Sequence, residues 1–161
     1  MIDSDSRGRP LRPARGFTLL ELLLVLAIVG VITAIAAPRY HASATRYRAE
    51  AAARRVVSDL TLARSRARAS SASRTVIFSV DSDQYTIVGV RHPDRPSEDY
   101  RTVLSAEPYK AQIVSAAFGG SEKVTFNGFG VPDSGGGVVV QAGSIQKKVS
   151  LHPQTGEASA Q

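Results

Sequence analysis

Hydrophobic residues follow three successive patterns along the chain. From residue 17 to residue 37 they are nearly continuous, between residues 49 and 67 they recur at helical spacing, and from residue 74 onward they alternate with polar residues. A long apolar run and a 3.6-residue repeat both predict helix, whereas period-two alternation predicts strands. We therefore expect an α+β protein in which a long N-terminal helix packs on an antiparallel β-sheet head.

The first apolar run, residues 17–38, is long enough to cross a bilayer. Only three of its residues are polar. Because a helix rises about 1.5 Å per residue, the run spans roughly 30 Å, the thickness of a hydrocarbon core. Pro38 stands where it can end or bend the helix. Four arginines precede the run, so the positive-inside rule predicts residues 1–16 in the cytoplasm and the rest of the chain outside.

Glu21 places a carboxylate inside this apolar run. An ionised acidic side chain is costly in the apolar layer, and such residues usually face a partner. Near the start of the run, the Glu21 side chain can either reach the lipid headgroups or pair with a cation from another subunit. Cleavage between Gly16 and Phe17 would create such a cation, because each new chain would begin with an α-amino group.

Two other interpretations of the run stay open. A secretory signal peptide has a basic region followed by an apolar one, and the small residues at positions 34–38 resemble a cleavage site. The run is longer than such signals usually are, and it contains an acidic residue. Alternatively, an uncleaved anchor could carry a periplasmic binding domain, which would need no cut after Gly16.

Residues 39–73 predict an amphipathic continuation of the helix. The segment is rich in alanine and contains neither Gly nor Pro, a composition that favours helix. Its apolar residues recur every three or four positions and so form one stripe on the helix, which is expected to pack on the sheet. The stripe consists of Ala49, Ala53, Val56, Leu60, Ala63 and Ala67. A serine cluster, residues 70–73, is expected to end the helix.

Arginines account for much of the net charge of +6, and nine of them lie between residues 39 and 74. We favour a solvated helix face, with Arg48, Arg55 and Arg66 directed away from the apolar stripe and with Glu50 supporting Arg54 at i, i+4. Contact with acidic surfaces of neighbouring subunits is a second interpretation. Nucleic-acid binding is a third, although few aromatic residues are interleaved for base stacking.

Residues 74–161 predict a β-rich head. Apolar and polar residues alternate within segments 74–80 and 84–90, which a short Asp-rich turn separates. This pattern predicts a hairpin. A polar, proline-punctuated loop follows at residues 91–101. Further strands are predicted at residues 101–107, 111–117, 124–126, 137–142 and 147–152, with a glycine-rich loop at 128–137 and a short strand at the end of the chain.

No catalytic or metal-binding constellation is found, so neither an enzyme nor a cofactor is expected. The chain has no cysteine, and its histidines at positions 41, 92 and 152 lack ligand spacing. Asp81 and Asp83 are expected to be turn residues, because the glycine and later glutamate of a calcium loop are missing. The glycine-rich loop lacks the Lys-Ser/Thr pair of a phosphate-binding loop.

The stretch RGFTLLELLLVLAIVGVITAIAAP, residues 15–38, resembles the type III signal of type IV pilins and type II secretion pseudopilins. The matching features are Gly16, Phe17, Glu21 four residues further on, and the apolar helix. The resemblance implies that a prepilin peptidase cuts between Gly16 and Phe17 and methylates the new amino terminus on Phe17. It also implies that Glu21 pairs with the Phe17 amine of a neighbouring subunit during assembly, in a low-dielectric layer where each charge alone is costly.

The C-terminal third is similar to that of the GspH/FimT-like minor pseudopilins. The similarity lies in residues 126–130, 135–137, 138–140 and 149–151 and in the closing Thr155-Gly156 turn. It implies a pilin-like fold and a structural role as a minor pseudopilin of a type II secretion system. Other pseudopilins, prepilin peptidase and the bacterial inner membrane would be its partners, with one membrane pass and the head in the periplasm.

A minor pilin of a type IV pilus or a DNA-uptake apparatus would share the same N-terminal features. In DNA-binding members of the family, basic residues near the C-terminus make the contact. This chain ends in TGEASAQ and has no arginine after Arg101. Nucleic acid is therefore not expected as a partner, although the residues leave it open.

Overall fold

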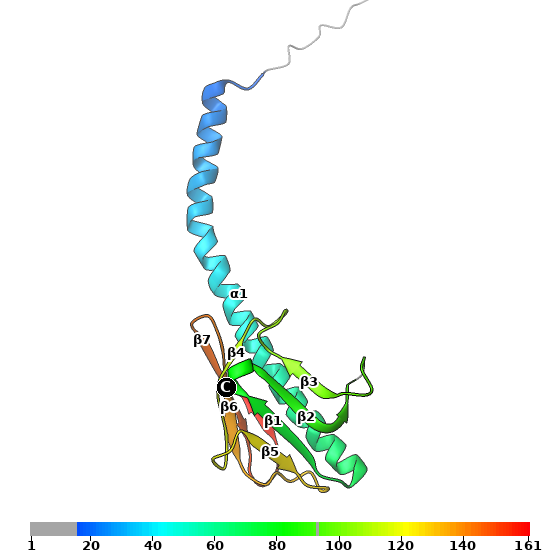
Figure 1. The fold of residues 1–161 in the computed structure, drawn as a ribbon. Helices are drawn as coiled ribbons and strands as arrows, with labels where there is room; N and C mark the ends of the chain where they lie inside the picture. The colour runs from blue at the N-terminus through cyan, green and yellow to red at the C-terminus, as the bar shows by residue number, and fades with distance from the viewer. Residues whose placement is uncertain (1–15, 93) are drawn as a thin grey trace, which may run out of the picture. The chain divides into compact units, whose positions relative to one another are not determined.

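The structure is a computed structural model that describes residues 16–92 and 94–161, without the side chains of residues 35–42 (Figure 1). The predicted leader, residues 1–16, lies outside the described residues except for Gly16. The chain divides into two compact units, residues 1–39 and 40–161. Helix α1 contributes to both units, and each unit is described by itself.

Helix α1 runs from Leu19 to Ser70. Its backbone remains helical through Pro38, so the proline does not end it. The helix ends at the predicted serine cluster, where Ser71 adopts a left-handed φ of 48°. The N–H of Ala72 donates to the carbonyl oxygen of Ala67 at 3.2 Å, which satisfies one of the last free carbonyls of the helix.

Among the residues described with their side chains, no helix combines the length and apolarity needed to cross a membrane. The side chains of residues 35–38, the last part of the predicted span, lie outside that description. The transmembrane helix at residues 17–38 stays a prediction from the sequence.

The strands form two antiparallel sheets of four strands each, so the predicted antiparallel β-sheet head consists of two sheets. The first has the order β3-β2-β1-β5 and the second the order β4-β6-β7-β8 (Figure 1). The first sheet contains β1 (Arg74–Ser79), β2 (Gln84–Arg91), β3 (Asp99–Val103) and β5 (Lys123–Phe126). The second contains β4 (Gln112–Phe118), β6 (Gly136–Ala142), β7 (Ile145–Leu151) and β8 (Ala158–Ala160).

The predicted hairpin is present, with a single turn of 3-10 helix, η1 (Val80–Ser82), between β1 and β2. The next strand differs from its prediction: β3 begins at Asp99 and ends at Val103, not at residues 101 and 107. Tyr100 pairs with Ile87 of β2 and is buried, which extends the strand into the predicted loop. Leu104 then turns away, and its N–H donates to the carbonyl oxygen of Asp83 at 2.8 Å.

One hydrophobic core joins the helix and both sheets. All six residues of the predicted apolar stripe are at most 1% exposed, which confirms that this face of α1 packs inward, and they belong to one cluster with buried side chains of both sheets. The rings of Phe78 on β1 and Phe118 on β4 stack with centroids 5.5 Å apart. This contact connects the two sheets across the core.

The glycine-rich segment contains the start of a strand. Gly136, which was predicted in the loop, and Gly137, the predicted start of the strand, both belong to β6 and pair with Phe118 and Ala117 of β4. A Cβ atom on Gly136 would lie 2.0 Å from the carbonyl oxygen of Ala117. The strands can therefore approach each other here only because this residue has no side chain.

Candidate functional site

The predicted processing site lies directly before α1. Gly16 and Phe17 are outside the helix, and Phe17 is 83% exposed. An exposed segment without regular structure is accessible to a peptidase. Cleavage between Gly16 and Phe17 and methylation of Phe17 stay predictions.

Glu21 lies in the first turn of α1. Its backbone N–H donates to Oγ1 of Thr18 at 3.2 Å, and the N–H of Leu22 donates to the Thr18 carbonyl oxygen at 3.1 Å. Thr18 is therefore the N-cap residue, and Glu21 holds the third helical position, the spacing of a capping box. An acidic side chain there is also favoured by the helix dipole. This capping role was not predicted from the sequence, although the T-x-x-E spacing of residues 18–21 signals it.

A buried carboxylate, Asp59 on α1, is the polar centre of the head. Asp59 is 3% exposed. It accepts hydrogen bonds from Nε of Arg55 (3.0 Å), Oη of Tyr85 (2.6 Å), Oη of Tyr100 (3.1 Å) and Oγ1 of Thr102 (3.0 Å). We call these five residues the Asp59 cluster. Both carboxylate oxygens are used, so the buried charge is compensated.

Three elements hold the Asp59 cluster in place. Tyr85 and Thr102 are direct cross-strand partners on β2 and β3, and Tyr100 lies two residues before Thr102, on the same face of the sheet. Arg55 precedes Asp59 by one helical turn and also donates to Oη of Tyr100. Its guanidinium carbon lies 5.8 Å from the centroid of the Tyr100 ring, within the range of a cation–π contact.

The electrostatics of the cluster follow from burial and from the Asp59 charge. Burial and, next, the nearby carboxylate raise the pKa of the Tyr85 phenol above its ordinary value, and the same causes raise the pKa of Tyr100. Burial by itself lowers the pKa of Arg55, but attraction to Asp59 outweighs it, so the net shift is upward. Both tyrosines thus remain neutral donors and Arg55 remains a cation, which suits a carboxylate acceptor.

The Asp59 cluster joins the helix to the sheet and leaves little room for chemistry on a substrate. Every member already contacts another member, and the carboxylate is buried. The Arg55 side chain is 37% exposed, so loss of one partner of this half-buried pair should cost less than the roughly 3–5 kcal/mol typical of a fully buried ion pair. The cluster therefore fixes how the helix lies on the first sheet.

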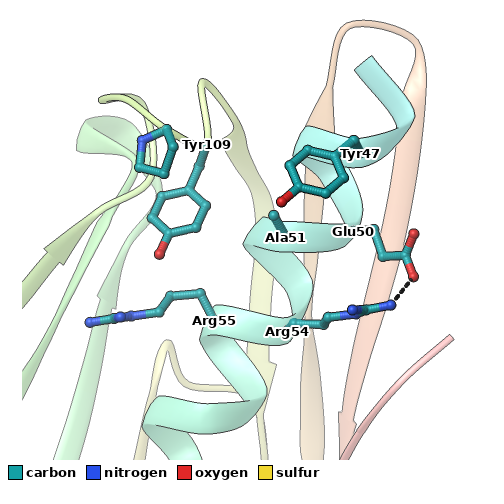
Figure 2. Close-up of a pocket in the computed structure, with 7 residues that line it drawn as sticks. Tyr47, Glu50, Ala51, Arg54, Arg55 and Tyr109 are labelled. Atoms are coloured by element: carbon teal, nitrogen blue, oxygen red, sulfur yellow. Dashed lines mark hydrogen bonds and ion pairs between the residues drawn. The ribbon is translucent and has the colours of Figure 1, made fainter. Parts of the chain in front are cut away.

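Next to this cluster is an open cavity of about 470 Å³ (Figure 2). Figure 2 shows Tyr47 on α1 and Tyr109 on the loop after β3 on opposite sides of it, with Arg55 beside Tyr109. Arg54 on its rim forms an ion pair with Glu50 at 2.5 Å. Aromatic rings and guanidinium groups offer contacts to a protein partner.

The arginines of the helix have two different environments. Arg54 is exposed and paired with Glu50 at i, i+4, which confirms that prediction. The expectation of a solvated face was wrong for Arg55, because its guanidinium reaches Asp59 and Tyr100. Arg66 is exposed, as expected.

The remaining candidate residues have structural roles. Asp83 has a left-handed φ of 50° in the β1–β2 turn, and its Oδ1 accepts the N–H of Ile113 at 2.7 Å. This hydrogen bond joins the first hairpin to β4. His92 and His152 each accept backbone N–H groups within their own loops, and the side chain of His41 lies outside the described residues. Within the part of the chain that the structure describes, no cluster of three possible metal ligands occurs.

Comparison with known families gives two matches. The model of the prokaryotic N-terminal methylation motif matches residues 11–37. The model of type II transport protein GspH matches residues 52–155, which is most of the head and more than half of the chain. The chain belongs to the GspH family. In this GspH-family chain, the methylation motif contains Gly16, Phe17 and Glu21, and the GspH match contains the whole Asp59 cluster.

Among solved structures, the type IV minor pilin FimU of Pseudomonas aeruginosa is similar to this GspH-family chain. The two share 17% sequence identity with a TM-score of 0.49, and the comparison covers 72% of this chain and 88% of the FimU chain. Comparison with curated proteins gives no match. The GspH match and the N-terminal methylation motif support a pilin-like protein, and the motif implies processing by prepilin peptidase.

Proposed function

We propose that this GspH-family chain is a minor pseudopilin of a type II secretion system, a structural subunit at the tip of a periplasmic filament. Prepilin peptidase cuts it between Gly16 and Phe17 and methylates Phe17. The residues 17–38 hold it in the bacterial inner membrane with a single pass, and the head lies in the periplasm. Its direct partners are other pseudopilins, and its role is mechanical.

The observation that carries the proposal is the order of the two family matches in one chain. A methylation motif at residues 11–37 is followed by a GspH match at residues 52–155, and α1 runs through both. The exposed Gly16-Phe17 segment in front of the helix is suited to processing.

The Asp59 cluster supports a mechanical role. A filament subunit transmits force between its helix and its head, so the helix must not slide on the sheet. Four hydrogen bonds to one buried carboxylate oppose such sliding, because any shift leaves a buried charge without partners.

Mass spectrometry of the mature chain from its native host tests the processing step. We expect an N-terminus at Phe17 that carries one methyl group. An intact leader, or a start after residue 37, would contradict the filament proposal and favour an anchored or secreted binding domain.

Deletion of the gene in its host distinguishes secretion from pilus function. We expect exported enzymes to accumulate in the periplasm while surface pili and DNA uptake are retained. Loss of pili or of DNA uptake with normal secretion would instead identify a minor pilin of a type IV pilus or an uptake apparatus.

A further inference from the structure

Three arginines from three elements line a cavity of about 410 Å³ at the C-terminal end of α1. Arg66 belongs to α1, Arg74 is the first residue of β1, and Arg91 is the last residue of β2. The other lining residues are Ala69, Ser70, Gly89 and Val90, so the lining contains no carboxylate. We call this cavity the arginine pocket.

The missing side chain of Gly89 leaves space for the Arg74 guanidinium. Gly89 has a φ of +77° and lies where the pairing of β2 with β3 is irregular. A Cβ atom there would be 3.3 Å from Nη1 of Arg74 and 3.5 Å from its Cδ and Cζ. The absence of a side chain on β2 thus lets the planar guanidinium lie against the strand.

Arg74 still has an unused donor. Its Nη1 donates to the carbonyl oxygen of Ser73 at 2.9 Å, whereas its Nε is buried and donates to no described residue. A buried guanidinium N–H without an acceptor is unfavourable. Arg74 therefore keeps one donor that the described residues do not satisfy.

The carboxylates that line the cavity adjacent to the arginine pocket have other partners. Oδ1 of Asp99 accepts the N–H of Gly89 at 3.0 Å, and Glu98 pairs with Arg95 at 3.4 Å. Both line an adjacent cavity, which shares Gly89 and Arg91 with the arginine pocket. Within the described residues, Arg66, Arg74 and Arg91 form no ion pair, so their positive charges are not neutralised by a contact.

From this geometry we propose that the arginine pocket binds a phosphate group. Guanidinium groups present paired N–H donors that match the spacing of phosphate oxygens. Three cations from different elements suit a phosphate, which carries more than one negative charge, better than they suit a ligand with a single carboxylate. The phosphate belongs either to free inorganic phosphate or to a phosphomonoester lipid headgroup. A nucleic-acid backbone fits less well, because no aromatic residue lines the cavity for base stacking.

Isothermal titration calorimetry of the full-length chain in non-ionic detergent, with inorganic phosphate at low salt, tests the proposal. We expect saturable binding that weakens by about tenfold in Arg74→Gln and in Arg91→Gln, because each loses one charge-assisted contact. Arg54→Gln is the matched control, since it removes the same charge from an exposed position outside the arginine pocket. Its affinity should equal that of the unaltered chain.

A second variant distinguishes binding that depends on guanidinium geometry from binding that depends on positive charge alone. Arg91→Lys keeps the charge but loses the planar fork, so its affinity should lie between those of the unaltered chain and Arg91→Gln. Urea unfolding of each variant checks that the head is folded. Absence of saturable phosphate binding, or an equal loss of affinity in Arg54→Gln, would overturn the proposal.

Comparing the affinity for a soluble lipid with that for inorganic phosphate distinguishes the two sources of the phosphate group. Dihexanoyl phosphatidic acid should bind more tightly than inorganic phosphate if the lipid headgroup is the ligand, and equally if free phosphate is. Either result depends on Arg74 and Arg91. Binding of a duplex oligonucleotide without any binding of inorganic phosphate would refute the phosphate pocket and indicate a nucleic-acid surface.

Discussion

The hydroxyl of Tyr85 donates a 2.6 Å hydrogen bond to Oδ2 of Asp59, and this contact joins β2 to α1 across 26 positions of the sequence. Thr102, the cross-strand partner of Tyr85, donates to the same oxygen at 3.0 Å. Both hydrogen bonds to this carboxylate oxygen therefore require that β2 and β3 pair in the observed register. If β3 slipped by one residue, Thr102 would point to the opposite face of the sheet.

Replacement of Asp59 by asparagine is expected to lower the free energy of unfolding of the head by about 3 kcal/mol, because Arg55 loses its counter-ion and an amide NH2 group replaces one of the two oxygens that accept from the hydroxyl donors. Tyr85→Phe removes one hydrogen bond and should cost about 1–2 kcal/mol. Urea unfolding followed by circular dichroism measures both.

The control for this substitution is Glu50→Gln, which breaks the exposed Glu50–Arg54 pair on the same helix. It should change stability by less than about 0.5 kcal/mol, since exposed i, i+4 pairs contribute little. Equal effects of Asp59→Asn and Glu50→Gln would show that the buried cluster does not stabilise the head.

The stability of the head should fall as the pH rises above about 10. The folded pKa of Tyr85 and that of Tyr100 are raised above the ordinary tyrosine value of 10.0. Above that value the unfolded chain releases these protons while the folded chain keeps them, so the free energy of unfolding decreases with pH. Denaturant titrations between pH 8 and pH 11 should show this decrease, with a shallower slope in Tyr85→Phe. A slope that is unchanged in the variant would contradict the assignment.

Gly136→Ala is expected to unfold or severely destabilise the second sheet, because its Cβ would lie 2.0 Å from a backbone oxygen of Ala117. Gly30→Ala is the matched control: apart from the backbone of its own helix, no described heavy atom lies within 4 Å of its added Cβ, and alanine favours helix by about 1 kcal/mol. Thermal unfolding compares the two. If both variants melt like the unaltered chain, the close approach of β4 and β6 is not required.

Substitutions of Glu21 separate its two possible roles. Glu21→Ala should leave membrane insertion intact and reduce incorporation into filaments. Glu21→Gln keeps the side chain of a capping box but removes the charge, so pairing with a Phe17 amine predicts the same loss of assembly as in Glu21→Ala. Co-purification of the variants with pseudopilins measures incorporation. Normal assembly of Glu21→Gln would leave capping as the role of this residue.

Much of the fold could be predicted because its patterns are local. The stripe from Ala49 to Ala67 repeats within one helix, and the β1–β2 hairpin depends on neighbouring segments and a short turn. The division into two sheets could not be predicted in this way, since period-two alternation shows which face of a strand is buried but not which strand lies beside it. Thus β5 pairs with β1, and β4 pairs with β6.

The Asp59 cluster was missed for a related reason. In sequence, Asp59 resembles one of the polar residues on an exposed helix face, and its partners on the sheet are 26 to 43 positions away. A local clue was available: Asp59 follows Ala52 and Val56 at helical spacing, which places it beside the apolar stripe. Its hydroxyl donors become evident only when β2 and β3 are adjacent.

The short distance along the chain between Gly16 and the first turn of α1 has an electrostatic consequence. A cut after Gly16 would leave Phe17 as the only residue before the Thr18 cap, so a new ammonium group would sit beside the positive end of the helix dipole. Two like charges at one helix end oppose each other unless a nearby anion compensates them. Glu21 lies in that same turn, so processing would convert an ordinary helix start into one whose stability depends on an acidic group.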